Sequence, residues 1–281
     1  FGERVAEGRL AAPGGADVVR LARADATDLA AIDRAIRGFR PGVIFNLAGY
    51  GVDRGERDES RARAINTDFP VALAGLAAEL GARLVHAGSA LEYGTASGDL
   101  HESTAPSPTT RYGITKLAGT EGVRAVAQAR GSVALTARLF TVYGAGEHAG
   151  RLLPSLYDQR GGDADIPLSG GGQRRDFTYV EDVAEGLLRL ADCTPRPGEA
   201  VNLCTGRLHT VRAFAELAAD ALGIPRARLA FGALPTRAEE MSHDDVSIAR
   251  LRALVGWSPD PSLGSGIRRA VAALDAGAPR A

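Results

Sequence analysis

The sequence predicts an α/β fold in which a doubly wound parallel sheet is joined to a smaller mixed α/β lobe. In the first half of the chain, short apolar stretches alternate with helical stretches of about 10–15 residues, a pattern that produces right-handed crossovers between parallel strands. After residue 143 a glycine-rich, irregular stretch replaces this rhythm. We therefore expect one unit over 1–143 and a second over 144–275, with 178–205 returning to the first.

Hydrophobic periodicity places the individual elements. Residues 29–38 carry apolar side chains on one face of a helix that Thr27 or Asp28 can cap. Residues 43–49 form a continuous apolar run, which is typical of a parallel strand buried on both faces. The other expected elements are helices over 2–11, 70–80, 112–130, 153–159, 180–191 and 210–222, and strands at 18–21, 83–87, 133–139, 200–203 and 228–231.

The composition argues against several classes of protein. The chain has 281 residues, a net charge of -1 and a pI near 6.6, without the basic surplus that nucleic-acid binding needs. No apolar run approaches the roughly 20 residues of a membrane span. Cys193 and Cys204 are too few for a disulfide framework, and no His, Cys or carboxylate cluster has metal-ligand spacing. We expect a cytoplasmic protein without a metal, a nucleic-acid partner or a membrane partner.

The stretch from Tyr112 to Lys116 carries the chemistry. Lys116 is the only lysine among 33 basic residues, which indicates that an ammonium is needed where a guanidinium would not serve. On a helix, residues four apart lie on one face, one turn apart. A fixed cation beside a phenol lowers the phenol's pKa from about 10, so Tyr112 becomes able to give or take a proton. The alternative is an exposed tyrosine followed by a solvated lysine.

Three further positions follow directly after expected strands. Gly49, Ser89 and Thr141 each come at the carboxyl end of an apolar run. In open parallel sheets, ligands bind beyond these ends. The sequence therefore predicts a ligand site that includes these three positions.

Four stretches in this order resemble the extended short-chain dehydrogenase/reductases, and within them the nucleotide-sugar epimerase/dehydratase group. They are residues 88–94 (GSALEYG), 138–144 (RLFTVYG), 173–183 (QRRDFTYVEDV) and 255–257 (VGW). The resemblance covers nearly the whole chain. It implies a Rossmann-type dinucleotide-binding domain in the first unit, a substrate lobe in the second, and NAD or NADP as the cofactor.

The resemblance also implies roles for individual residues. Tyr112 is the expected proton shuttle, Lys116 is expected to hold the nicotinamide ribose, and Ser89 is expected to bind the sugar oxygen that becomes a carbonyl. Asp25 is expected at the adenine, although a turn residue is the alternative. Further cofactor contacts are implied for Ala26, Leu47, Ala48, Gly49 and Leu139, and substrate contacts for Thr141, Arg151, Arg175 and Arg237.

Several of these positions have an alternative reading. Ala48 and Gly49 are small enough for backbone to approach the cofactor, but they also suit a close-packed turn. Arg175 and Arg237 can clamp a diphosphate through bidentate hydrogen bonds, whereas most arginines of such a chain are solvated surface charges. The family also begins with a strand and a GxxGxxG turn whose helix binds the pyrophosphate, and neither occurs in this sequence. We therefore expect that the first ~40 residues of a Rossmann half are missing.

The residues around Ser89 and Thr141 narrow the range of reactions that the family resemblance allows. Where the family's 4,6-dehydratases have Thr-Asp-Glu, this chain has Ser89-Ala90-Leu91, which lacks an acid/base pair for elimination. Glu92 resembles an arrangement in 4-keto-6-deoxy-sugar reductases, or else is a surface residue. Thr141 stands where UDP-sugar epimerases commonly have asparagine.

These features predict an NAD(P)-dependent nucleotide-sugar epimerase or 4-ketoreductase that transfers a hydride at sugar C4. The alternatives are a cofactor-sensing regulator or scaffold of the same fold, and an inactive fragment. Such regulators can lose the catalytic pair, so the presence of Tyr112 and Lys116 favours the enzyme. We also expect a homodimer formed through helices 70–80 and 113–130, and a nucleotide-diphosphate sugar as the substrate.

Overall fold

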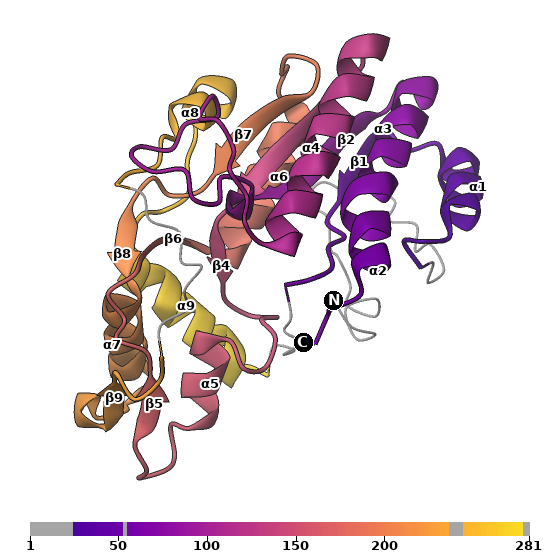
Figure 1. Ribbon diagram of the computed structural model, residues 1–281. Helices are drawn as coiled ribbons and strands as arrows, with labels where there is room; N and C mark the ends of the chain where they lie inside the picture. Colours follow the sequence, from indigo (N-terminus) through magenta and orange to yellow (C-terminus); the bar gives the residue numbers. More distant parts are fainter. Residues whose placement is uncertain (1–24, 53–54, 236–243, 278–281) are drawn as a thin grey trace.

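The computed structural model describes residues 25–52, 55–235 and 244–277, and it confirms the α/β fold with a parallel sheet (Figure 1). Four parallel strands form the main sheet in the order β1-β2-β3-β7. They are β1 (Val43–Asn46), β2 (Arg83–Ser89), β3 (Ala134–Leu139) and β7 (Glu199–Leu203). The register pairs Ser89 with Leu139 and Leu139 with Leu203, so these three strands end at the same level.

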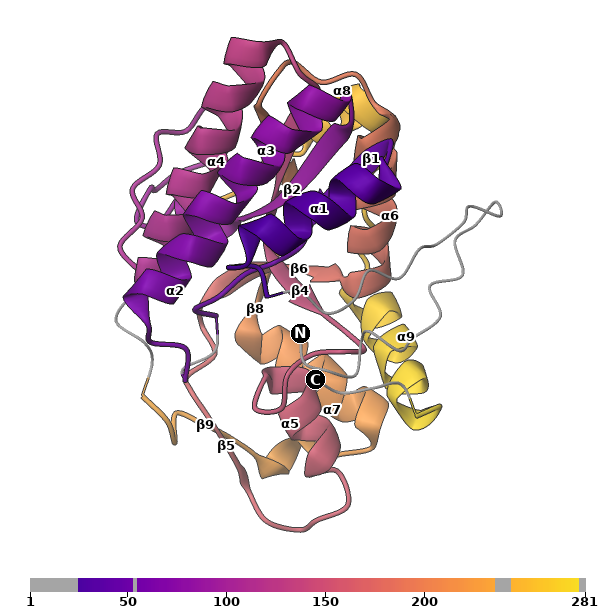
Figure 2. The same ribbon diagram turned by 90° about the vertical axis from the view of Figure 1, so that its right-hand side faces the viewer.

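Helices cover both faces of this sheet (Figure 2). On one face, α3 (Phe69–Leu80) and α4 (Arg111–Arg130) pack on β2, and α1 (Leu29–Phe39) lies against α3. The other face is covered by α6 (Val180–Asp192) and α8 (Ala249–Val255). Burial of these apolar surfaces supplies most of the driving force for folding this part of the chain.

Local sequence signals set the helix ends. The Asp28 carboxylate accepts from the Ala31 amide at 3.0 Å and caps α1, as expected. Thr110 caps α4 in the same way through the Gly113 amide at 3.0 Å. Helix α4 ends at Gly131, whose φ of 60° lies in the left-handed region that favours glycine. These two caps fix where the Tyr112 helix begins and ends.

A second lobe follows the main sheet along the chain. Its strands are β4 (Thr141–Tyr143), β5 (Ile166–Leu168), β6 (Arg174–Tyr179), β8 (Leu208–Thr210) and β9 (Leu229–Phe231), and its helices are α5 (Leu152–Asp158), α7 (Val211–Leu222) and α9 (Leu263–Asp275). Stacked Phe177 and Phe214, with ring centroids 4.5 Å apart, stand at the centre of its core. Between β6 and β8 the chain returns to the main sheet through α6 and β7. The division of the chain into two units at residue 143 stays a prediction.

Two expectations about individual elements need correction. The strand expected over 43–49 ends at Asn46, and Phe45 on it is 38% exposed, so burial on both faces is wrong. Among the described residues β1 pairs with β2 and with no other strand. The helix expected over 2–11 and the strand at 18–21 lie outside the described residues. Within the described ranges, no helix combines the length and apolar character needed to cross a membrane.

Candidate active site

A cleft of about 880 Å³ opens between the carboxyl ends of the main sheet and the second lobe. This volume lies within the range of small-molecule and cofactor sites. Gly49, Ser89 and Thr141, the three positions that follow apolar runs in the sequence, all line it. The other expected site residues that line it are Leu47, Ala48, Tyr112, Lys116, Leu139, Arg151 and Arg175.

Ser89 and Tyr112 lie next to each other in this cleft. Ser89 stands at the end of β2, where its hydroxyl also accepts from the Leu91 amide at 3.2 Å. Tyr112 lies in the first turn of α4, and the Ser89 side chain is close enough to its phenol to have a lowering effect on the pKa of Tyr112. Burial, with a smaller contribution from the negative charge of Glu92, raises the pKa of Tyr112 to about 12.

Lys116 lies one turn further along α4 and is only 2% exposed. Its Nζ donates to the Ala87 carbonyl at 2.6 Å. Burial lowers the pKa of Lys116 to about 8, against the opposing effect of Glu92. Our expectation that Lys116 lowers the pKa of Tyr112 is therefore wrong for this structure. The ammonium is turned toward Ala87, and burial dominates at the phenol.

Asn66 is a site residue that sequence reasoning missed. It lies in a π-helical turn, Ala64–Asp68, and is fully buried. Its amide nitrogen donates to the Tyr50 carbonyl at 2.7 Å and to the Thr115 hydroxyl at 2.9 Å, while its oxygen accepts from the Tyr50 amide. Asn66 thereby ties the loop after β1 to the Tyr112 helix. The features that single out Asn66 are structural: its side-chain amide is buried, and it lies in a π-helical turn. Such turns often mark functional sites.

The residues on the sheet side of the cleft fit a dinucleotide at its nicotinamide end. The Tyr112 hydroxyl and Lys116 ammonium are flanked there by the small residues Ala48 and Gly49. A Cβ at Gly49 would lie 3.8 Å from the Tyr112 hydroxyl, so this turn passes close to the phenol. These residues can hold a ribose between hydrogen-bonding groups and a small-residue backbone.

Asp25 and Ala26 do not line the cleft. The Asp25 carboxylate accepts from the Thr27 amide at 3.0 Å and forms an ion pair with Arg61 at 3.0 Å. These contacts match the turn-residue alternative. Contact of Asp25 with adenine stays a prediction.

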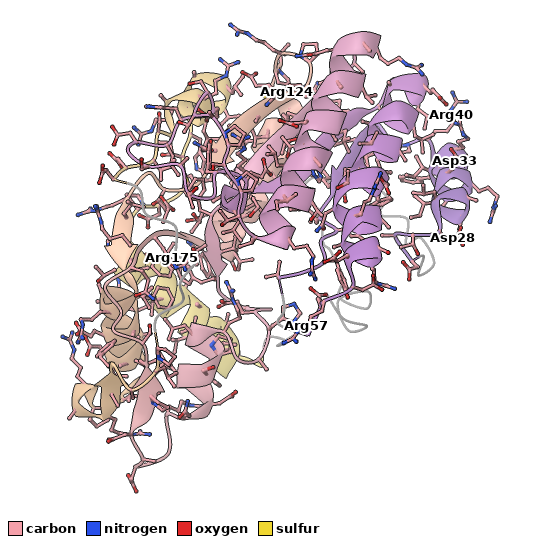
Figure 3. The ribbon with its side chains drawn as sticks, viewed as in Figure 1. Asp28, Asp33, Arg40, Arg57, Arg124 and Arg175 are labelled. Carbon is pink, nitrogen blue, oxygen red and sulfur yellow. The ribbon has the colours of Figure 1, made fainter. Side chains whose placement is uncertain are left out.

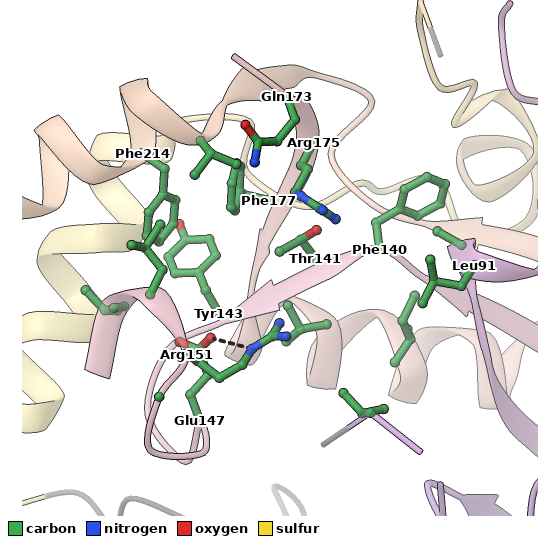
Figure 4. Close-up of a pocket in the computed structure, with 18 of the residues that line it drawn as sticks. Leu91, Phe140, Thr141, Tyr143, Glu147, Arg151, Gln173, Arg175, Phe177 and Phe214 are labelled. Carbon is green, nitrogen blue, oxygen red and sulfur yellow. Dashed lines mark ion pairs between the residues drawn. The ribbon is translucent and has the colours of Figure 1, made fainter. Parts of the chain in front are cut away.

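The second lobe contributes polar side chains from two directions (Figure 4). Arg175 comes from β6, Arg151 from the start of α5, and Thr141 of β4 lies between them. Arg151 forms an ion pair with Glu147 at 3.6 Å, and Gln173 lies beside Arg175 in the same wall. Figure 3 shows Arg175 at the junction of the main sheet and the second lobe. Glu147 and Gln173 were not predicted from the sequence, and Arg237 lies outside the described residues.

The sequence family follows from comparison with known proteins. A profile of the NAD dependent epimerase/dehydratase family matches residues 4–204. The chain belongs to this family. The description of the family as NAD dependent confirms the expected class of cofactor.

Three curated relatives show the range of activities in the family. An "Uncharacterized UDP-glucose epimerase" of Bacillus subtilis is 30% identical over 191 residues, which is 68% of this chain and 60% of that protein. A dTDP-6-deoxy-L-talose 4-dehydrogenase of Kitasatospora kifunensis is 29% identical over 268 residues, 92% of this chain and 82% of that protein. A dTDP-4-dehydrorhamnose reductase of Mycobacterium tuberculosis is 35% identical over 178 residues, 61% of this chain and 56% of that protein.

Solved structures share the fold over most of the chain. RMD from Pseudomonas aeruginosa, complexed with NADPH, superimposes with a TM-score of 0.79 at 23% identity, over 91% of this chain and 88% of that one. MoeE5, in complex with UDP-glucuronic acid and NAD, gives a TM-score of 0.76 at 26% identity over 91% and 85%.

Proposed function

We propose that this chain uses NAD or NADP to transfer a hydride at C4 of a nucleotide sugar, as a 4-ketoreductase or an epimerase. The observation that carries the proposal is the meeting of Ser89, Tyr112 and buried Lys116 in one cleft. Interconverting an alcohol and a ketone requires a proton carrier at the hydroxyl, and the pair of Ser89 and Tyr112 provides one. Relatives that act on dTDP-linked 6-deoxy sugars support the assignment.

The two hydroxyls divide the work at one sugar oxygen. During reduction the neutral phenol of Tyr112, whose pKa is raised to about 12, donates its proton to the C4 oxygen while Ser89 hydrogen-bonds the same oxygen. In the reverse direction the tyrosinate accepts that proton again. A dinucleotide, when bound, would supply or accept the hydride. Lys116 holds positive charge close to this exchange, since a pKa of about 8 leaves it mostly protonated at neutral pH.

The wall beyond Ser89 is apolar, which favours a 6-deoxy sugar. Leu91 and Phe140 lie together at one end of the cleft, and Ala90 precedes them (Figure 4). A hydroxyl buried against such a wall without a partner costs about 1–3 kcal/mol, and a carboxylate costs more. The methyl group of a 6-deoxy sugar has no such desolvation cost against this wall. The same wall lacks the carboxylates that dehydration needs, which supports reduction or epimerisation over 4,6-dehydration.

The phosphate groups of the substrate would lie between Arg175 and Arg151. Guanidinium groups bind phosphate oxygens through paired charge-assisted hydrogen bonds. The two side chains enter the cleft from different elements, so they can hold a diphosphate from two sides. Arg237 stays a proposed third contact.

The deciding experiment follows cofactor absorbance with the protein that carries this chain. The substrate is a dTDP-4-keto-6-deoxyhexose with NADH or NADPH, and the product is identified by chromatography. Tyr112→Phe should lose at least about two decades of turnover, because a general acid/base contributes roughly 10²–10⁴ in rate. Tyr157→Phe removes a phenol that donates to Asp275 in the second lobe, and it serves as the control. Dinucleotide binding without reduction or epimerisation of any nucleotide sugar would favour the sensor alternative.

We also propose a homodimer through the outer faces of α3 and α4. The small side chain of Ala118 is exposed on α4, and Ile114 of the same helix is 51% exposed. Small residues allow two helix pairs to approach closely. Light scattering should report a dimer for the parent and a monomer for Ala118→Arg.

A further inference from the structure

A buried ionic cluster lies behind the Ser89–Tyr112–Lys116 site and takes no part in the reaction described above. Its centre is Glu92, which is fully buried in the short 3-10 turn Ala90–Glu92 that follows β2. Oε1 of Glu92 accepts from the Ser89 amide at 2.8 Å and from the Thr120 hydroxyl at 3.0 Å. Its Oε2 accepts from Arg138 Nε at 2.9 Å. The carboxylate thus joins the end of β2 to α4 and β3.

Neighbouring residues pack closely around the Glu92 carboxylate and its partner Arg138. The Arg138 guanidinium lies over the Tyr93 ring, 4.5 Å from its centroid, and Tyr93 donates to Asn202 of β7 at 2.7 Å. At Gly88 a Cβ would lie 2.7 Å from Glu92 Oε1 and 2.6 Å from Thr136. Any side chain at that position would therefore displace the carboxylate or the strand.

Stability by itself is a weak reason for such a pair. Buried ion pairs can often be replaced by apolar residues of similar volume with no loss of stability. The contacts of Glu92 instead point to the reaction site, because one of them holds the main chain of Ser89. Its charge also acts on both groups of α4. Burial raises the pKa of Tyr112 and Glu92 raises it further, whereas at Lys116 burial lowers the pKa and Glu92 opposes it.

We propose that Glu92 is a positioning residue of this active site, which fixes the Ser89 main chain and places a buried negative charge behind Tyr112 and Lys116. Arg138 and Thr120 hold the carboxylate in this place. The proposal rests on the proposed function where it concerns turnover, but its electrostatic part does not. In the described part of the chain, the titratable or charged groups around the cluster are Arg138 of β3, Tyr112 and Lys116 of α4, His86 of β2 next to Lys116, Tyr93 of the same loop, Glu56 near Tyr112 and Glu102 near Tyr93.

The first experiment needs neither substrate nor activity. Because Lys116 is the only lysine in the sequence, lysine-specific isotope labelling gives a single side-chain NMR signal that can be titrated. In Glu92→Gln the midpoint of Lys116 should move to lower pH, since the charge that favours the ammonium is gone. Tyr93→Phe removes only the hydrogen bond to Asn202 and should leave the midpoint in place. Equal midpoints in the parent and Glu92→Gln would overturn the electrostatic part, whatever the enzyme's activity.

The second experiment separates positioning from simple bracing of the fold. Glu92→Leu combined with Arg138→Met removes both charges, so stability should stay near that of the parent. Turnover should still fall by roughly 10- to 100-fold with KM little changed, because the Ser89 main chain loses its anchor. Glu92→Gln should lose less, since its amide oxygen still accepts from Ser89. In the pH dependence of turnover by Glu92→Gln, the acidic limb and the basic limb should both move to lower pH, because Glu92 raises the pKa of Lys116 and of Tyr112. If the double variant has the stability and the turnover of the parent, Glu92 only stabilises the fold and the proposal fails.

Discussion

Ion pairs in the two parts of this molecule differ in their burial and therefore in how much stability is lost when one partner is removed. Beside the main sheet, Arg138 and Glu92 pair with side chains that are 2% and 0% exposed. In the second lobe, Arg226 and Asp220 pair at 2.5 Å with side chains that are 56% and 47% exposed. Solvent screens an exposed pair, whereas a buried pair cannot lose one member without stranding the other charge. An arginine-rich composition therefore says little until the burial of each arginine is known.

The largest effect should come from breaking the buried pair on one side only. Arg138→Met leaves the Glu92 carboxylate without its cation and should lower the free energy of unfolding by about 3–5 kcal/mol. Arg226→Gln breaks the exposed pair and should leave the unfolding midpoint unchanged within error. Urea denaturation of both variants measures the contrast. Equal losses in the two variants would contradict it.

The pH dependence of stability tests the burial of Lys116. Its pKa in the folded protein is lowered from 10.5 to about 8, so the unfolded chain binds more protons between these values. The penalty for the buried charge is present below pH 8 and disappears as the pH rises to 10.5. Relative to Lys116→Met, the parent should therefore gain about 3 kcal/mol of stability across this window. A constant difference in unfolding free energy would show that Lys116 is solvated.

An exchange of lysine and arginine sharpens the same contrast at the level of catalysis. Lys116→Arg keeps the charge but places a wider, planar guanidinium group in a buried site, so turnover should fall about 100-fold. Arg269→Lys makes the reverse change at an exposed position that pairs with Glu181 and Asp182, and turnover should stay at the parental level. Steady-state kinetics on a competent nucleotide sugar compares them. Near-parental turnover of Lys116→Arg would mean that the single lysine has no chemical significance.

The smallest predicted effect concerns an arginine of the cleft. Arg175→Ala should weaken nucleotide-sugar binding by roughly 10- to 150-fold, the value of one charge-assisted bidentate contact, and leave dinucleotide affinity unchanged. Arg130→Ala, at the exposed end of α4, is the control. Calorimetry with the nucleotide sugar and with the dinucleotide distinguishes the two losses. An unchanged affinity in Arg175→Ala would make this arginine a surface charge.

Much of the fold was predictable because its signals are local. The Asp28 cap, the helix that carries Tyr112 and Lys116, and the apolar strands at 83–87 and 133–139 all appear where periodicity placed them. The three-residue strands β4, β5 and β8, the six-residue strand β6, and the helices α8 and α9 were not predicted. Three-residue strands contain too few positions for a period of two to be distinguished from chance.

The sequence by itself determined the order of the main-sheet strands and their helices, because periodicity can be read along the chain. Its four motif stretches indicated the family, and that resemblance implied that Ser89 and Tyr112 act together. Only the tertiary structure decided that Glu92 is buried against Arg138, 46 residues away, and that Asn66 reaches Thr115, 49 residues away. Such contacts depend on how helices pack across a sheet, and no local spacing records that. The raised pKa of Tyr112 belongs with them, because burial is a property of the folded molecule.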